Sequence, residues 1–96
     1  MAVDELEAFI DEGIRQGVRR KYHPTVFMRM RRDFGTVEAI TKLVESGEIQ
    51  SGFKRMKALG LLEWTIETAV MKFPRRFKSR TRECASFRLD QARKLK

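Results

Sequence analysis

The spacing of apolar side chains is the feature of this sequence that most constrains its fold. In the first twenty residues they recur every three or four positions, at Val3, Leu6, Ile10, Ile14 and Val18. This spacing places them on one face of an amphipathic helix. Acids at positions 4, 5 and 7 lie at the start of this stripe and bases at 19–21 at its end, which suits the helix dipole at both ends and accounts for the basic cluster without a partner. Gly13 and Gly17 either admit a close neighbour or mark a bend.

Glycine, proline and hydroxyl residues divide the next forty positions into three further helices. We expect them over residues 24–35, 36–47 and 51–60, because proline suits a first helical position, Thr36 and Ser51 can cap, and a glycine closes each segment. In the first of them the predicted inward stripe is Val26, Phe27, Met30 and Phe34, with Arg29, Arg31 and Arg32 outward. The inward residues of the other two are Val37, Ile40, Leu43, Val44, Phe53, Met56 and Leu59.

Residues 61–73 fit two patterns. Thr65 as a cap, with apolar residues at helical spacing up to Phe73, predicts a helix that Pro74 stops. The alternation of Leu62, Trp64 and Ile66 with polar residues is typical of a strand instead. We favour the helix. A last helix, capped by Ser79 or Thr81, is expected over residues 79–95, with an inward face of Cys84, Phe87, Leu89, Ala92 and Leu95.

These elements predict an all-α fold, a compact bundle of five to six short helices in a single domain spanning residues 1–96. The alternative is a winged helix-turn-helix with a small β-wing after residue 60. Residues 36–60 fit helix, short turn and helix, and three bases lie on the second helix. The stretch "FKRMKALGLLEW" is similar to the end of a recognition helix that runs into a strand.

Charge is segregated along the chain. The net charge is +8, and it arises from residues 13–35, which carry +6, and residues 69–96, which carry +8. Residues 1–12 carry −5 and residues 36–68 carry −1 instead. A basic connector over 72–82, "KFPRRFKSRTR", contains no acid. Clustered cations favour an anionic partner, since interspersed charges would cancel. The candidate contact residues are Arg29, Arg31, Arg32, Lys54, Arg55, Lys57, Arg75, Arg76, Lys78, Arg80 and Arg82.

The residues that usually carry catalysis or hold metals are scarce. His23 is the one histidine and Cys84 the one cysteine, which excludes a histidine pair, an internal disulfide and a multi-cysteine metal site. No phosphate-cradling glycine loop or nucleophile elbow is present. We therefore predict no enzymatic activity, no cofactor and no metal. Apolar runs are far shorter than the roughly 18 residues of a membrane span, and the acidic start is unlike a signal peptide, so a cytoplasmic protein is expected.

Three blocks within residues 22–73 resemble a small helical bacterial and phage family of uncharacterised function. The first block is "YHPTVFMRM", with Tyr22, Pro24, Thr25 and Phe27. The second, "GTVEAITKLVESGEIQSGF", includes Gly35, Val37, Glu38, Ala39, Ser51, Gly52 and Phe53. The third, "LGLLEWTIETAVM", includes Leu59, Gly60, Leu62, Glu63, Thr65 and Glu67. The resemblance implies an all-helical module associated with DNA processing or defence, without catalytic residues to carry over, and gives no guidance on the basic tail.

Two functional hypotheses follow, beside the simpler interpretation that the basic surface mainly keeps the bundle in solution. The first is a small nucleic-acid-binding protein, monomeric or homodimeric, that contacts the phosphates of DNA or RNA mainly without reading sequence. The second is a phage- or defence-related inhibitor or accessory subunit that docks on a nuclease or ribonucleoprotein through the same basic surface. The acidic segment at residues 1–12 fits the second better, because it would repel a nucleic acid.

Overall fold

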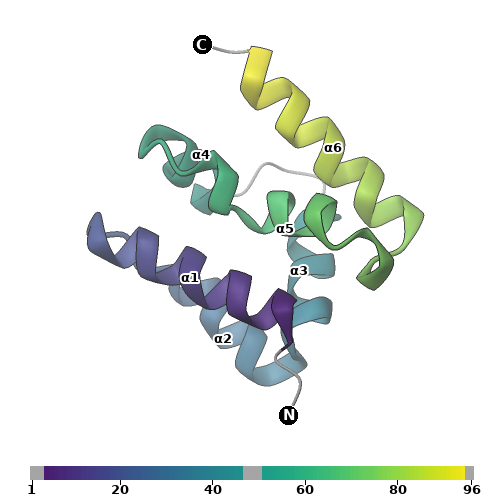
Figure 1. Ribbon diagram of the computed structural model, residues 1–96, viewed down its shortest axis with the longest axis horizontal. Coiled ribbons are helices and arrows are strands. Elements are labelled where there is room, and N and C mark those ends of the chain that lie inside the picture. The colour runs from purple at the N-terminus through teal and green to yellow at the C-terminus, as the bar shows by residue number, and fades with distance from the viewer. Residues whose placement is uncertain (1–3, 47–50, 95–96) are drawn as a thin grey trace.

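The computed structural model describes residues 4–46 and 51–94, and within these ranges the chain is all-helical with no strand (Figure 1). The six α-helices are α1 Glu5–Arg19, α2 Thr25–Phe34, α3 Thr36–Val44, α4 Ser51–Ala58, α5 Ile66–Lys72 and α6 Ser79–Lys94. Two short 3₁₀ turns, η1 Leu62–Trp64 and η2 Pro74–Arg76, flank α5. The predicted compact bundle of five to six helices is confirmed.

The ambiguous segment after residue 60 is helical, so the β-wing alternative is wrong. Thr65 has extended backbone angles and accepts a hydrogen bond from the N–H of Thr68 at 3.2 Å, which caps α5 as predicted. The hydroxyls of Thr65 and Thr68 also donate to the carbonyl of Leu62, at 2.8 and 2.7 Å. This carbonyl therefore has hydrogen-bond partners without a neighbouring strand. The alternating residues Leu62, Trp64 and Ile66 lie in a 3₁₀ turn and at the start of α5.

The core is built around α5, which lies at the centre of the bundle between α1 and α3 on one side and α6 on the other (Figure 1). The main cluster of buried side chains contains Leu6, Ile10, Phe27, Ala39, Ile40, Val44, Ala69, Val70, Phe77 and Ala85. A second, smaller cluster joins α4 to α6 through Phe53, Leu89 and Ala92. Phe77 is buried, and Phe73 packs against the main cluster, so two aromatic rings anchor the basic connector to the core.

The inward face of α2 differs from the prediction. Phe27 is buried, but Val26 and Phe34 are 55% and 54% exposed. Arg31 instead turns toward α1, where Glu7 and Asp11 bind it. Residues 27 and 31 share a helix face, and periodicity alone would assign an apolar residue to both positions. The pair of acids on α1 allows an arginine to occupy position 31 instead. The prediction that Arg31 points outward is therefore wrong.

The inward face of α6 also differs. Phe87 is 63% exposed, whereas Arg88 is buried and hydrogen-bonded to Glu67, Leu43 and Ser46. The buried face of the described helix consists of Thr81, Ala85, Arg88, Leu89 and Ala92. Apolar spacing favours Phe87 as an inward residue because it is hydrophobic. Burial of Arg88 depends instead on hydrogen-bond acceptors that come together only in the folded chain.

Two of the predicted helix caps have other roles. Thr36 is the first residue of α3, Gly35 precedes it as the cap residue, and the Thr36 hydroxyl donates to Glu7 on α1. Thr81 lies inside α6, and its hydroxyl donates to Glu45. Helix α6 begins at Ser79, so the basic segment 72–82 starts at the end of α5 and finishes in the first turn of α6. The predicted residues Val3, Gly47 and Leu95 lie outside the described ranges.

Candidate nucleic-acid interface

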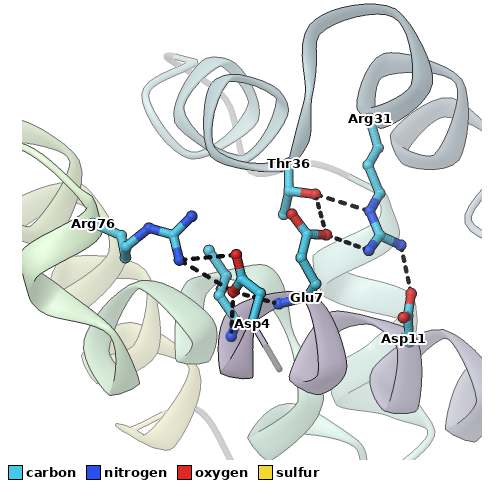
Figure 2. A network of polar contacts seen from close by, with 7 residues as sticks. Asp4, Glu7, Asp11, Arg31, Thr36 and Arg76 are labelled. Atoms are coloured by element: carbon cyan, nitrogen blue, oxygen red, sulfur yellow. Dashed lines mark hydrogen bonds and ion pairs between the residues drawn. The ribbon is translucent and has the colours of Figure 1, made fainter. Parts of the chain in front are cut away.

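Arg31, one of the candidate phosphate contacts, is bound within the protein. Figure 2 shows its guanidinium between Glu7 and Asp11 of α1, with N–O distances of 2.5 and 2.8 Å, while its Nε donates to the Thr36 hydroxyl at 2.9 Å. The Thr36 hydroxyl in turn donates to Glu7 at 2.6 Å. Burial lowers the pKa of Arg31, but the hydrogen bonds to Glu7 and Asp11 outweigh it and raise the pKa overall. Arg31 therefore joins α2 to α1 and is not available to a partner.

Arg76, in the basic connector, pairs with the first residue that the structure describes. Its Nη1 lies 3.2 Å from Oδ1 of Asp4 (Figure 2). The same carboxylate oxygen caps α1, because it accepts hydrogen bonds from the backbone N–H groups of Leu6 and Glu7. The hydrogen bond from Arg76 and that from the Glu7 N–H lower the pKa of Asp4. This contact connects the start of α1 to η2, 72 residues later.

Three further candidates have partners near them in the fold. Arg80 pairs with Glu45 at 3.4 Å, and Arg32 with the neighbouring Asp33 at 3.3 Å. Arg82 folds back over the connector, where its guanidinium donates to the carbonyls of Pro74 and Phe77 at 3.2 and 2.6 Å. The Pro74 carbonyl also accepts from the backbone N–H of Phe77 at 3.3 Å, so Arg82 adds a second donor there and bonds the Phe77 carbonyl from its side chain. These bonds hold Arg82 against the connector.

The other candidates lie on three separate parts of the molecule. Arg29, Lys54, Arg55, Arg75 and Lys78 are exposed and make no hydrogen bond or ion pair with a described residue, and Lys57 is half-buried. Figure 1 shows α2, α4 and the η2–α6 junction at different edges of the bundle. The eleven predicted cations therefore do not form one continuous surface. Arg75 and Lys78, together with the partly paired Arg80, form one group that we call the η2–α6 corner.

The structure brings together a second basic group that the chain divides. Tyr22, just after α1, lies with its ring against Gly17 and its hydroxyl against Gly52 of α4, so that a Cβ atom on Gly52 would lie 2.7 Å from that hydroxyl. Burial raises the pKa of Tyr22, and the nearby charge of Arg55 opposes the shift. This packing places the end of α1 beside α4. We call the resulting group the α1–α4 corner, and it consists of Arg19, Arg20, Lys21, Lys54 and Arg55.

All five side chains of the α1–α4 corner are exposed, and none forms an ion pair with a described acid. Arg20 makes only a 3.5 Å hydrogen bond to Gln16. The sequence places residues 19–21 in a basic block, 19–32, that the nucleic-acid hypothesis includes, but the helix dipole also explains them and they are not among the candidate contact residues. The signal that could have found them is the tyrosine that follows them, but its contact with α4 depends on tertiary packing.

The described residues offer little for other chemistry. His23 is exposed and Cys84 half-buried. No group of three or more His, Cys, Asp or Glu side chains among residues 4–46 and 51–94 is placed to hold a metal ion. In the same part of the chain no helix is long and apolar enough to cross a membrane.

Fold and surface together define a small all-helical bundle with exposed basic corners. No family model, no curated protein and no solved structure matches this chain, so the assignment of function depends on its own geometry.

Proposed function

We propose that this protein binds nucleic acid through phosphate contacts centred on the α1–α4 corner, with Arg75 and Lys78 of the η2–α6 corner as secondary contacts. The observation that carries the proposal is the contact of Tyr22 with Gly52, which brings together two exposed basic segments more than thirty residues apart whose five cations form no ion pair with a described residue. Three of the five are arginines, whose planar guanidinium can bind a phosphate through two hydrogen bonds.

The acidic start of the chain opposes this function less than its composition indicates. Asp4 pairs with Arg76, and Glu7 and Asp11 share Arg31, so three of the five acids of residues 1–12 have cationic partners within the protein. The second hypothesis, an inhibitor or accessory subunit that docks on a nuclease or ribonucleoprotein, depended partly on those acids being free. We therefore favour the nucleic acid as partner, and the earlier resemblance to a DNA-processing or defence family is compatible with it.

The proposal is tested by fluorescence anisotropy with a labelled 20-base-pair duplex and the matching single strand, between 50 and 200 mM KCl. If each of the five cations neutralises one phosphate, log K for the duplex falls against log salt with a slope of about −4.5. Replacing Lys54 and Arg55 with glutamine should make this slope shallower by about 2. The control is the double variant Arg29→Gln/Arg32→Gln on α2, which removes the same charge elsewhere and should change the slope much less.

The proposal would be overturned if neither the duplex nor the single strand bound at 50 mM KCl. It would also be overturned if the salt slope became shallower by the same amount in the two double variants. In the first case the alternative gains support if the purified protein retains a partner from nuclease-treated lysate, because complexes bridged by nucleic acid are lost under that treatment.

A further inference from the structure

A cavity of about 270 Å³ lies between α1, the start of α2, α4 and the η1–α5 region. Buried apolar residues line it, among them Ile10, Phe27, Phe53 and Met56. An apolar cavity of roughly 150 Å³ in a protein core is known to hold a benzene molecule. This cavity is therefore large enough for one six-membered ring with short substituents.

The exposed residues that line the cavity show where it opens. They are His23, Thr25 and Val26, which follow α1 and begin α2, and Ser51, the first residue of α4. The mouth therefore lies between the two segments of the chain that carry the cations of the α1–α4 corner. Three of these four residues have side chains that can exchange hydrogen bonds with the polar edge of a ring.

Tyr22 connects this mouth to the basic corner. It lines the cavity, follows Lys21 directly in the chain, and packs against Gly17 and Gly52, which also line the cavity. The charge of Arg55 acts on the Tyr22 side chain. Cations of the corner therefore lie beside the opening of an apolar cavity, and this combination favours a ligand that has both an uncharged flat ring and several negative charges.

An unpaired stretch of nucleic acid has both properties. Its bases are uncharged rings that bind to aromatic and apolar side chains, and each nucleotide adds a negative phosphate. In a duplex each base is paired and stacked, so placing one in a cavity costs the free energy of flipping it out. A small organic anion could also fill the cavity, but a single carboxylate would use only a fraction of the five exposed cations. The single strand fits the cavity and the corner together.

We infer that the protein binds single-stranded nucleic acid in preference to duplex, with one base of the strand inside this cavity and the neighbouring phosphates on the α1–α4 corner. The inference rests on the proposed function and names the form of nucleic acid that the same site takes. A pyrimidine, which is one six-membered ring with short substituents, matches the size of the cavity.

The test is fluorescence anisotropy at 100 mM KCl with a labelled strand of ten thymidines, an abasic strand with the same ten phosphates, and a ten-base-pair duplex. We expect the thymidine strand to bind about tenfold more tightly than the abasic strand, because only the thymidine strand supplies a base. The two strands should have the same salt slope, since they use the same phosphates. The thymidine strand should also bind more tightly than the duplex, although phosphate contacts alone favour the duplex through its higher charge density.

Two variants locate the base within the fold. Ile14→Phe narrows the cavity from a half-buried position on α1 and leaves every cation in place. It should weaken the thymidine strand about fivefold or more, while affinity for the abasic strand stays within about twofold. The matched control is Met28→Phe, which adds the same ring at an exposed position of α2 outside the cavity and should change neither affinity by more than about twofold.

Equal affinity for the thymidine and abasic strands would overturn the inference and leave the proposed function standing, because phosphate contacts alone would then account for binding. Tighter binding of the duplex than of the thymidine strand, or full thymidine affinity in a folded Ile14→Phe protein, would also overturn it. If neither strand nor the duplex binds, the proposed function fails and the inference fails with it. Should Ile14→Phe not fold, the backbone amide shifts of wild-type Ile14 and Ile66 decide, since these cavity residues must respond to the thymidine strand and not to the abasic one.

Discussion

Lys21 is the one described residue other than glycine with a positive φ, 64°. It follows α1, where the N–H of Lys21 bonds the carbonyl of Val18 and the N–H of Tyr22 bonds that of Gly17, each at 2.9 Å. This is the hydrogen-bond pattern with which helices commonly end, and the left-handed position in it is usually a glycine. Gly60, with φ of 74°, has the same role after α4. The lysine is therefore strained by its own Cβ atom.

Replacing Lys21 with glycine should raise the free energy of unfolding by roughly 1 kcal/mol, because glycine adopts this conformation without the Cβ contact. Urea denaturation at pH 7 measures the change. The matched control is Arg20→Gly at the preceding residue, where φ is −103° and glycine has no such advantage. That variant should lose stability, since glycine gains freedom in the unfolded chain. A Lys21→Gly protein no more stable than wild type would contradict this account.

Single residues also account for the largest errors of sequence reasoning. Arg31 was predicted to point outward and is half-buried, and Arg88, which the predicted inward face of the last helix does not include, is buried. Each of them binds a carboxylate more than twenty positions away in the chain, Glu7 and Glu67. Burial of an arginine is favourable only where such partners are in place, and no local pattern reports their position.

At the scale of elements, glycines on α1 and α4 determine how closely the helices meet. A Cβ atom on Gly13 would lie 2.9 Å from the backbone carbonyl of Trp64, and one on Gly17 would lie 3.2 Å from that of Tyr22. The close neighbour predicted from these glycines is therefore present. The neighbour of Gly13 is the η1 turn, and that of Gly17 is the loop between α1 and α2. Neither could be identified without knowing how the helices pack.

Replacing Gly52 with alanine should lower the free energy of unfolding by about 1 kcal/mol, although alanine is otherwise the better helix former. The cause is the Tyr22 hydroxyl, which would lie 2.7 Å from the new Cβ atom, whereas the next ring atom would lie 3.8 Å away. In a Tyr22→Phe background the same change should become neutral or stabilising. Thermal and urea unfolding of the four proteins of this double-mutant cycle measure the coupling.

The control for that cycle is Gly13→Ala, where the obstacle is a backbone carbonyl that no side-chain change removes. Its loss of stability should be the same with Tyr22 or with phenylalanine at position 22. If Tyr22→Phe relieved both alanine variants equally, the hydroxyl would not be the cause.

At the scale of the whole molecule, the exposed pair of Asp4 and Arg76 ties the first helix to the connector before the last one. The pKa of Asp4 is lowered in the folded protein, chiefly by Arg76 and by the N–H of Glu7. A carboxyl whose pKa falls on folding stabilises the fold while it is ionised in both states. That contribution is complete above its ordinary pKa and is lost as the pH falls through the lower, folded value.

The variant Asp4→Asn keeps a capping side chain but removes the charge. We expect the wild-type protein to lose more stability than this variant between pH 5 and pH 2.5, measured by urea denaturation at each pH. The difference between the two should shrink in 0.5 M salt, because both partners are exposed and screened. Parallel pH profiles at low salt would show that the pair does not contribute.

The sequence by itself determined the helical class, most helix boundaries and the cap of α5. These depend on apolar spacing, on Thr65 and on Gly35 and Gly60, which act over a few residues. Tertiary structure alone decided which cations form ion pairs, which basic segments lie together at the α1–α4 corner, and that Arg88 meets Glu67 in the core. The physical reason is range: helix signals are local in the chain, whereas charge pairing and cavities depend on residues that only folding brings together.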